Sequence, residues 1–538
     1  MKKSFLSVFA LLIVFLSLAY AQFPPRHVAL GDWLMLHGSL GHNGFGALKG
    51  QITSWSVKYT VSLCTGESQP AVADVNADGL PEIIFNCYGS SNVYAIRGTN
   101  GAILWTSVVS GGSWGAPAVA NVLPSTPGLE IVVCNSSGTQ LLNGQTGAVI
   151  WTSPYGCGSN PGAPAVAYDG GDTLVLVNNN TTLYALRASN GTLVWSAATG
   201  GATFVGIAKS PAVGDINGDT SLDVVVGGNG TVYAYRFTNG ALLWTRSVGT
   251  RYYTRTPATL VDITGDCVDE VLISDDNGNI YALNGADGSS LWTYNISGQM
   301  ACGPISAADV NGDGINDVIV GTLGSCNCGS PGRTVVINGA TGTLIWQQTF
   351  DGPNMTHGGG RVVSDFDSDG QLEIAVVPYL NSLMCFGDGI FRMFNASTGA
   401  IEWTSGGIVG EGSSFADVDG DGCSEILVLP SAGTSTLIVV DDNTAVSCGF
   451  YPYNDTCGVL GYDDPVKVDE GAGVKRLEVQ SGKGYITLIS NHPTFARIYT
   501  PNGRLIASFK INGREIVFLR KGIYIVKFTD KTFTAVVK

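Results

Sequence analysis

Six short acidic loops carry the strongest chemical signal in this sequence. Each follows the pattern D-x-[D/N/T]-x-D-x-x-x-[D/E], with oxygen-bearing side chains at positions 1, 3, 5 and 9. Ca²⁺ takes about six to eight oxygen ligands, and a loop with this spacing can wrap one ion with four side chains and a backbone carbonyl. We therefore expect structural Ca²⁺ ions in these loops. The predicted ligands are Asp74, Asn76, Asp78 and Glu82; Asp215, Asn217, Asp219 and Asp223; Asp262, Thr264, Asp266 and Glu270; Asp309, Asn311, Asp313 and Asp317; Asp365, Asp367, Asp369 and Glu373; and Asp417, Asp419, Asp421 and Glu425.

The surroundings of these loops distinguish them from other acidic turns. Position 6, where a sharp turn favours glycine, is glycine in four loops, but Thr220 and Cys267 stand there in the other two. Strand-like runs flank the loops, so they are not EF-hands, which need flanking helices. Asp and Asn also make ordinary Asx-turns, but six such loops at regular spacing favour ion binding. Two further units, at Asn121–Glu130 and Tyr168–Thr173, depart from the pattern, and we expect no ion there.

A long sequence repeat sets the spacing of the loops. Aromatic residues recur at intervals of 44 to 57 residues, and most follow a tight Asn-Gly, Asp-Gly or Thr-Gly turn between alternating apolar runs. Each unit then contains four short strands, and such units repeated radially form a β-propeller. We count eight blades, with seven as the alternative, and segment 27–55 is a candidate for closing the ring. The repeated aromatic residues are Tyr59, Trp105, Trp151, Trp195, Trp244, Trp292, Trp346 and Trp403.

Two known repeat families resemble these units. The acidic loops, with lead-ins such as Pro70-Ala71-Val72, resemble FG-GAP/VCBS repeats, and the hairpins running from Gly288 to Trp292 and its equivalents resemble quinoprotein-type (PQQ-like) repeats. The resemblance covers residues 59–442 and implies an all-β propeller fold. It does not fix the function, because propellers host many activities. Quinoprotein dehydrogenases often carry two adjacent cysteines beside the cofactor, and this sequence has no Cys-Cys pair.

The first 21 residues have the features of a Sec signal peptide. Lys2 and Lys3 precede an apolar stretch that is too short to span a bilayer, and Ala19-Tyr20-Ala21 forms a small-x-small cleavage site. The 12 cysteines suit an oxidising compartment, and Cys448 and Cys457 bracket a loop that a disulfide could close. The net charge of −15 argues against nucleic acid as a partner. We therefore expect a secreted or cell-surface protein.

The composition changes near the C-terminus. Residues 22–446 form the predicted propeller, 447–473 a linker, and 474–538 a small β-sandwich of about seven short strands, in which 12 basic residues outnumber 3 acidic ones. The order Asn502-Gly503-Arg504-Leu505, Lys521-Gly522-Ile523-Tyr524 and terminal Lys538 is similar to the C-terminal sorting domain of the type IX secretion system. This resemblance implies the secretion machinery as a partner, then cleavage or surface attachment after outer-membrane passage. A generic sandwich that binds a ligand or a neighbour is the alternative.

Binding is the favoured class of function, although an enzyme is not excluded. The five histidines form no HExxH-type pair, His37 and His42 are interpreted as packing or turn residues, and no GxSxG elbow or P-loop is present. The loops that link one blade to the next, together with those between the second and third strands, open on one face of a propeller, called the inter-blade face. Aromatic and arginine side chains on this face would suit an extracellular glycan or protein ligand, although they could instead pack between blades. The alternative is an extracellular polysaccharide lyase on an eight-bladed calcium-binding propeller, with His357 or Arg251 as the base. The predicted ligand-binding residues are Trp114, Tyr155, Phe204, Arg251, Tyr252, Tyr253, Arg255 and His357.

Overall fold

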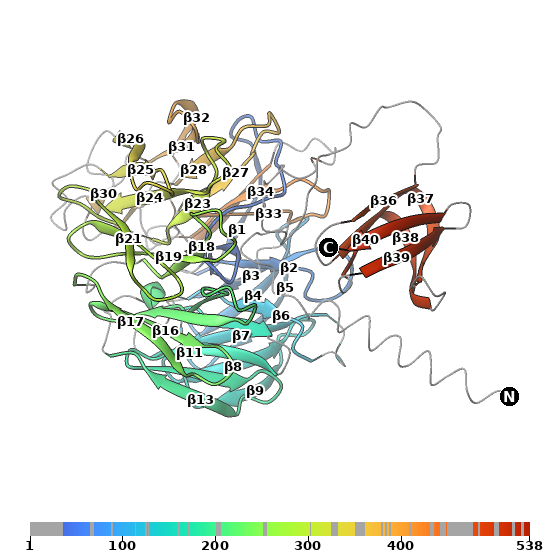
Figure 1. Cartoon of the computed structure of the whole chain (residues 1–538), viewed down its shortest axis with the longest axis horizontal. Helices are drawn as coiled ribbons and strands as arrows, with labels where there is room; N and C mark the ends of the chain where they lie inside the picture. Colours follow the sequence, from blue (N-terminus) through green and yellow to red (C-terminus); the bar gives the residue numbers. More distant parts are fainter. Residues whose placement is uncertain are drawn as a thin grey trace. The chain divides into compact units, whose positions relative to one another are not determined.

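The computed structural model divides the chain into two units, Met1–Tyr451 and Pro452–Lys538 (Figure 1). In the first unit it describes residues 36–448, except 65–68, 88–89, 113–114, 124–125, 127, 159–161, 169–171, 201–205, 251–255, 302, 324–331, 350–360, 378–379, 382–384, 387–388, 408–409, 411, 431–434 and 442–447. In the second unit it describes five strands between residues 477 and 537. Each unit is described by itself.

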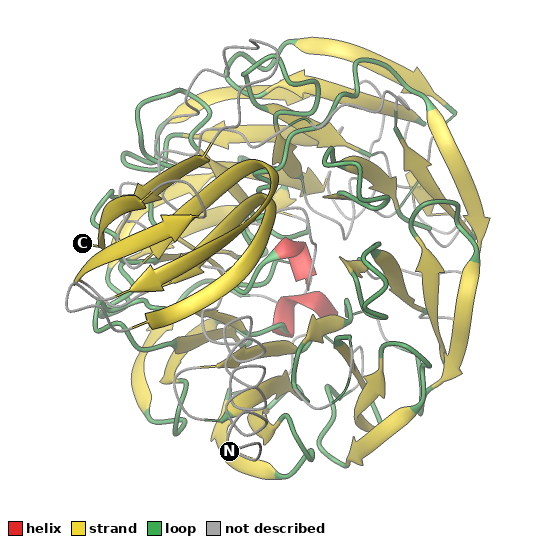
Figure 2. Ribbon diagram, turned by 90° about the vertical axis from the view of Figure 1, so that its right-hand side faces the viewer, coloured by secondary structure: helices red, strands yellow, loops and turns green. Residues whose placement is uncertain are grey.

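The first unit is a ring of eight antiparallel sheets, blades 1 to 8 (Figure 2). The eight predicted blades are thereby confirmed. Short, fully buried runs such as Ala-Val-Ala form the innermost strands, because both of their faces pack against neighbouring blades. In blade order the innermost strands are β2(Ala71–Ala73), β6(Ala118–Ala120), β10(Ala165–Tyr168), β14(Ala212–Gly214), β18(Thr259–Val261), β23(Ser306–Ala308), β27(Val362–Ser364) and β33(Ser413–Ala416).

The second and third strands complete the core of each blade. The second strands are β3(Glu82–Asn86), β7(Glu130–Asn135), β11(Thr173–Asn178), β15(Asp223–Gly227), β19(Glu270–Ser274), β24(Asp317–Leu323), β28(Glu373–Val376) and β34(Glu425–Val428). The third strands are β4(Asn92–Arg97), β8(Gly138–Asn143), β12(Thr182–Arg187), β16(Thr231–Arg236), β20(Asn279–Leu283), β25(Arg333–Ile337), β31(Ile390–Asn395) and β35(Thr436–Val440). Blade 6 has a fifth strand, β22(Met300–Ala301). Between β28 and β31 of blade 7 the chain forms a separate two-stranded hairpin, β29(Leu380–Asn381) with β30(Cys385–Phe386).

The outermost strands carry the repeated aromatic residues, and one of them closes the ring. They are β5(Ile103–Val108), β9(Val149–Ser153), β13(Leu193–Ala198), β17(Leu242–Ser247), β21(Ser290–Asn295), β26(Leu344–Thr349), β32(Ile401–Gly406) and, for blade 8, β1(Val57–Ser62). Strand β1 precedes the other strands in the sequence and pairs with β35, the last strand of the ring. The closing strand therefore lies just after the segment 27–55 in which we expected it.

Seven of the eight repeated aromatic residues join their blade to the next one by a hydrogen bond. The indole Nε1 of Trp195, for example, donates to the carbonyl of Phe237 at 2.9 Å. The ring of Trp195 also covers Gly240, whose φ is +68° and where a Cβ atom would lie 2.5 Å from the indole. The glycine of each turn thus serves both the left-handed conformation and the close approach of the neighbouring indole. Equivalent indole-to-carbonyl bonds join Trp105 to Gly144, Trp151 to Ala188, Trp244 to Gly285, Trp292 to Gly339 and Trp346 to Ala396, and the Tyr59 hydroxyl donates to Gly98.

The N-terminal segment Leu36–Ile52, called the central segment, fills the axis of the ring instead of adding a blade strand. It begins with the short helix η1(Leu36–Gly38), and Figure 2 shows this helix and η2(Gly206–Lys209) in the middle of the ring. Successive carbonyls of the central segment accept N–H groups from successive blades: Leu40 from Val213, Gly41 from Leu260, Asn43 from Ala307, Gly44 from Val363 and Lys49 from Ser424. At its start, the Gln69 side chain accepts the His37 N–H, and Leu36 packs with Ala116 and Ala163. The central segment therefore contacts the innermost part of every blade.

The two histidines of the central segment have structural roles, as predicted. The ring of His37 is buried, with Nδ1 2.7 Å from the His42 carbonyl and Nε2 3.1 Å from the Arg361 carbonyl. Burial lowers the pKa of His37 to about 4, although the two carbonyls oppose this shift. His42 Nδ1 lies 3.0 Å from the Ala258 carbonyl. Both rings therefore secure the central segment to the inner strands.

Disulfides crosslink loops of the ring, and one of them ties a loop to strand β7. They link Cys64 to Cys87, Cys134 to Cys157 and Cys423 to Cys448, and Cys267 is also disulfide-bonded. The suggested pairing of Cys448 with Cys457 is therefore wrong. The chain after β35 returns to the acidic loop of blade 8, where the Cys448 N–H donates to the Gly422 carbonyl at 3.1 Å, and this return brings Cys448 to Cys423. Disulfides are typical of extracytoplasmic proteins.

The second unit contains β36(Leu477–Ser481), β37(Tyr485–Tyr499), β38(Leu505–Phe518), β39(Gly522–Phe528) and β40(Thr532–Val537). They form one antiparallel sheet of five strands, two of them long, where we expected about seven short strands in two sheets. Strand β38 pairs along the whole of β37, whereas β36 and β39 pair with its first and last parts. The predicted Asn502-Gly503 hairpin lies between β37 and β38, and residues 500–504 are outside the described residues. The sandwich stays a prediction.

Candidate metal centres

Each predicted metal loop joins the innermost strand of a blade to the second strand, which begins with a buried acid at position 9. This acid is at most 1% exposed in all six loops. One of its oxygens accepts the backbone N–H of position 2, as between Glu373 Oε2 and Phe366 or between Glu425 Oε2 and Val418, both at 2.7 Å. The acid therefore holds the loop to its strand and has a second oxygen for another ligand.

All six loops have the same backbone shape. Positions 4 and 6 have a positive φ in every loop, whichever residue stands there. Thr220 (φ 66°) and Cys267 (φ 72°) adopt the left-handed conformation of the glycines at position 6. This conformation costs a residue with a Cβ atom about 1 kcal/mol. These two loops therefore keep the backbone conformation of the other four, although they lack glycine at position 6.

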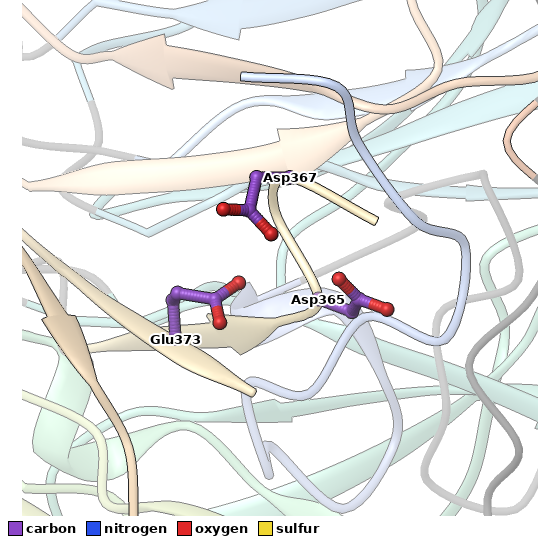
Figure 3. Close-up of side chains that lie close together, drawn as sticks. All are labelled: Asp365, Asp367 and Glu373. Carbon is purple, nitrogen blue, oxygen red and sulfur yellow. The ribbon is translucent and has the colours of Figure 1, made fainter. Parts of the chain in front are cut away.

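Blade 7 brings three predicted ligands into one cluster. Asp365, Asp367 and Glu373 each offer an oxygen, all within 4.8 Å of one another, and their side chains surround a common space (Figure 3). Asp365 and Glu373 are fully buried, yet Asp365 Oδ1 and Glu373 Oε1 have no hydrogen-bond partner. Because a buried carboxylate oxygen without a partner is costly, these atoms fit a bound cation. A set of oxygen donors suits a hard divalent ion such as Ca²⁺.

Blade 8 holds the second cluster. Asp417, Asp419 and Glu425 offer oxygens within 4.8 Å of one another, and the fully buried Glu425 has one oxygen, Oε1, without a hydrogen-bond partner. The Asp417 carboxylate accepts the N–H groups of Gly420 at 2.6 Å and Gly422 at 3.0 Å, which hold the loop around it. This cluster also fits a divalent cation.

The loops of blades 1, 4 and 6 differ at position 3, where an asparagine replaces the acid. Its amide nitrogen donates to the acid at position 9, as between Asn76 and Glu82 at 2.8 Å and between Asn217 and Asp223 at 2.7 Å. The amide oxygen is the atom that could bind a cation. Among the described residues, blades 7 and 8 alone gather three acidic ligands, so only two of the six predicted sites are assembled from carboxylates.

The acids at position 9 all have raised pKa values. Burial is the main cause, and neighbouring carboxylates of the same loop add to it. Without a cation, these acids therefore tend to hold a proton at neutral pH, and a divalent ion can replace that proton. The pKa rises to about 7 for Glu82, Asp223 and Asp317, to about 8 for Glu270 and to about 9 for Glu373, and it lies well above the ordinary value for Glu425.

Lysines from the start of the chain reach both clusters, which sequence reasoning missed. Lys49 Nζ lies 2.7 Å from Asp365 Oδ2, and Lys58 Nζ lies 2.5 Å from Asp419 Oδ2 and 2.6 Å from Asp441 Oδ2. Lys58 is separated from Asp419 by 361 residues, so no local pattern could reveal the contact. The sequence offered one clue to this contact: Lys58 directly precedes Tyr59, which occupies the position of the repeated tryptophans in the unit that closes the ring.

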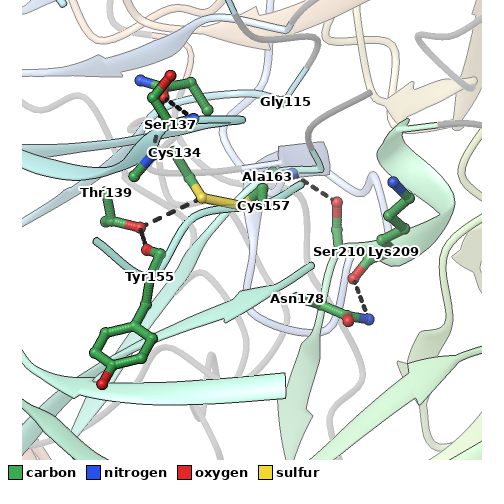
Figure 4. The surroundings of a disulfide bond; sticks show 12 residues. Gly115, Cys134, Ser137, Thr139, Tyr155, Cys157, Ala163, Asn178, Lys209 and Ser210 are labelled. Carbon is green, nitrogen blue, oxygen red and sulfur yellow. Dashed lines mark hydrogen bonds between the residues drawn. A yellow bond between two sulfur atoms is a disulfide. The ribbon is translucent and has the colours of Figure 1, made fainter. Parts of the chain in front are cut away.

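The axis of the ring contains another buried cation that the sequence did not reveal. Lys209, at the end of η2, is 1% exposed and donates to the Asn180 side chain, and burial lowers its pKa to about 8. Its carbonyl accepts from the Asn178 amide at 3.3 Å, near the Cys134–Cys157 disulfide (Figure 4). These contacts secure η2 between blades 3 and 4.

Of the eight predicted ligand-binding residues, only Tyr155 is among the described residues. It follows the outermost strand of blade 2, is half-buried and packs on the Tyr184 ring with centroids 4.9 Å apart. Its carbonyl accepts from the Thr139 hydroxyl at 2.6 Å (Figure 4). Tyr155 therefore packs within its part of the ring. The other seven, which lie outside the described residues, are Trp114, Phe204, Arg251, Tyr252, Tyr253, Arg255 and His357.

A comparison with known families agrees with this architecture. A family model described as outer membrane protein assembly factor BamB matches residues 75–294, from blade 1 to blade 5. Over these residues the repeats are similar to PQQ-like repeats of the BamB type. No curated protein matches the chain. The resemblance to FG-GAP/VCBS repeats stays a prediction.

Solved structures with a similar fold include two dehydrogenases. Quinohemoprotein alcohol dehydrogenase from Comamonas testosteroni is 14% identical, with 76% of this chain and 80% of that chain covered and a TM-score of 0.54. A europium-containing methanol dehydrogenase is 14% identical, with 74% and 89% covered and a TM-score of 0.54. BamB from Moraxella catarrhalis is 18% identical, with 72% and 100% covered and a TM-score of 0.47. At these identities the likeness concerns the fold alone.

Proposed function

We propose that this protein is an exported, Ca²⁺-stabilised propeller that binds a glycan or a protein ligand outside the cell. The observation that carries the proposal is the central segment, which occupies the axis and hydrogen-bonds to inner strands across the ring. A ligand would therefore meet the loops on a face of the ring. Many loops around a rigid scaffold form a broad surface, which suits a polymer or a protein better than a small cofactor.

The proposed role of the ions is to hold the loops on the opposite face. The metal loops of blades 1 and 4 to 8 lie at the same end of the strands as the Gly-containing turns of blades 1 to 7, and the inter-blade loops lie at the other end. The unpartnered oxygens of Asp365, Glu373 and Glu425 support cation binding in blades 7 and 8. An ion there would connect the innermost strand to the second strand of its blade, and so stabilise the side of the ring that faces away from the ligand.

The proposed route of export uses both ends of the chain. Residues 1–21 are proposed to be a Sec signal peptide, and the basic residues 474–538 a type IX sorting or attachment domain that contacts the secretion machinery. The disulfides support an extracytoplasmic location. Among the described residues there is no helix with the length and hydropathy to cross a membrane.

The binding proposal is tested with the full chain on a glycan array and against acidic polysaccharides in solution. We expect measurable binding without release of unsaturated product, and binding that persists in chelator below the melting temperature, because the ions lie on the opposite face. Tyr155→Ala should weaken binding if the inter-blade face is used, whereas Tyr294→Ala, on the outermost strand β21, serves as the matched control. Release of unsaturated product would favour the lyase, and the absence of any glycan or protein ligand would overturn the proposal.

A further inference from the structure

One residue in the outermost strand of every blade has no partner on the third strand. In blade 1, Trp105 lies opposite Ala95 and Ile103 lies opposite Ile96, so Leu104 between them is an additional residue, a β-bulge. The same register shift occurs just before the repeated aromatic residue in all eight blades. The bulge residues, from blade 1 to blade 8, are Leu104, Ile150, Val194, Leu243, Leu291, Ile345, Glu402 and Lys58.

Six of these bulge residues are apolar, and the two charged ones belong to the two blades with acidic clusters. In blade 8, the bulge places Lys58 against the metal loop of its own blade, where its ammonium group contacts Asp419 at 2.5 Å and Asp441 at 2.6 Å. Lys58 is only 13% exposed, so water screens these contacts weakly. The bulge position therefore reaches the metal loop of its blade.

In blade 7, the bulge residue has the opposite charge. Glu402 Oε1 accepts from the Asn395 amide at 3.2 Å, and Asn395 lies directly opposite Glu373 in the sheet. Glu402 is exposed as a residue, but partial burial of its carboxyl group and the charges of Asp367 and Asp369 raise its pKa, so the group lies in the field of the cluster. Glu402 therefore adds a fourth acidic group beside the three clustered carboxylates, whereas Lys58 adds a cation to the cluster of blade 8.

We infer that the bulge residue sets the divalent-cation affinity of the metal loop in its own blade: Glu402 raises the affinity of the blade 7 site, and Lys58 lowers that of the blade 8 site. A carboxylate attracts an ion of charge +2 and an ammonium repels it. Lys58 contacts Asp419 of its cluster directly, and Glu402 is joined to its cluster through Asn395, which lies opposite Glu373. The inference rests on the proposed cation binding and adds to it the residues that tune each site. Lys49 also contacts Asp365, but it comes from the central segment and stays in place when the bulge residue is changed.

Calcium titration of the full chain tests the inference, with the number of ions counted by native mass spectrometry and affinities measured by calorimetry. Glu402→Gln should weaken binding at one site by about 3-fold to 10-fold, and Lys58→Met should strengthen it at another by a similar factor. Glu402→Lys should weaken the blade 7 site further than Glu402→Gln. Ile150→Gln, at the exposed bulge of blade 2, is the matched control and should change no affinity.

The outcomes separate this inference from the proposed function. Absence of bound ions in the wild type would overturn the cation proposal itself. Ions that bind the wild type and every variant with equal affinity would overturn the role of the bulge residues alone. Lys58→Met could fail to fold, because Lys58 lies in the ring-closing strand. The exposed Glu402 variants then still decide, since a Glu402→Lys protein that binds Ca²⁺ as tightly as the wild type contradicts the inference.

Discussion

The acidic loop of blade 7 and the corresponding loop of blade 2 both contain a buried glutamate, but the second oxygen of that glutamate has different surroundings in the two loops. In both, the second strand begins with a buried glutamate whose Oε2 accepts backbone N–H groups of the loop. In blade 2, Glu130 Oε1 accepts from the Thr126 hydroxyl, so both oxygens are satisfied by the chain. In blade 7, Glu373 Oε1 has no such donor and lies beside Asp365 and Asp367.

This difference separates two roles of the buried acid. One oxygen holds the loop to its strand, a role that blades 2 and 7 share, and the other oxygen decides whether the loop needs a ligand. In blade 2 the Thr126 hydroxyl satisfies the second oxygen of Glu130, so the loop needs no ion. We expect an ion only where further carboxylates stand in place of that hydroxyl. A buried acid at this position is therefore not enough to predict a metal site.

The largest effect that would test this comparison is that of removing the ions. With chelator, we expect the melting temperature of the full chain to fall by about 5–10 °C, because an ion at 100 times its Kd contributes about 2.7 kcal/mol per site. Hydrogen exchange should locate the loss: amides of β28 in blade 7 should lose protection, and those of β7 in blade 2 should keep it. Equal loss in both strands would contradict the comparison.

The second effect is a dependence on pH that calcium removes in part. In chelator, burial raises the pKa of Glu373 from its ordinary value of 4.5 to about 9 and that of Glu270 to about 8. The folded state then binds more protons than the unfolded state between pH 4.5 and 9, so stability should fall as the pH rises through this window. Saturating Ca²⁺ should remove the part of the fall that comes from Glu373, because an ion in the blade 7 cluster stabilises the ionised form, and should leave the part that comes from Glu270. Urea unfolding at pH 5, 7 and 9 measures it.

The blades could be predicted from the sequence because each is built by local contacts. The turn glycines, the repeated tryptophans and the acidic loops all lie within one repeat, so their spacing gives the number of blades and the shape of each loop. Even Thr220 and Cys267, which break the glycine pattern, adopt the predicted conformation because the rest of their loops imposes it.

The parts that could not be predicted depend on contacts that form only when the ring closes. The central segment, Lys58 and the pairing of Cys423 with Cys448 join residues that no repeat places side by side. The blade 7 and blade 8 clusters also differ from the other loops in a way that one spacing pattern conceals. Asparagine and aspartate both offer oxygens, but only aspartate at position 3 gives a cluster of three carboxylates.

A third prediction concerns the replacement of the buried glutamate by glutamine in each of the two loops. Glu373→Gln should lower stability by about 2 kcal/mol in Ca²⁺, because it weakens an ion site. It should have little effect in chelator, because the carboxyl that it replaces already holds a proton at neutral pH. Glu130→Gln should cost about 1 kcal/mol in both conditions, because it disturbs only hydrogen bonds within the chain. Urea unfolding of both variants, with and without Ca²⁺, gives the comparison. A calcium-dependent cost for Glu130→Gln would show that blade 2 also holds an ion.

The smallest effect concerns the hydroxyl that makes blade 2 independent of ions. Thr126→Val keeps the shape of the side chain but leaves Glu130 Oε1 without its donor, which should cost about 1–2 kcal/mol. Two outcomes are then distinct in unfolding curves. If the loop lacks other ligands, the cost is the same with and without Ca²⁺, since a single carboxylate cannot hold an ion firmly. If Ca²⁺ restores the lost stability, the neighbouring Asn121 and backbone carbonyls complete a site, and the hydroxyl would be a substitute for an ion rather than a feature that excludes one.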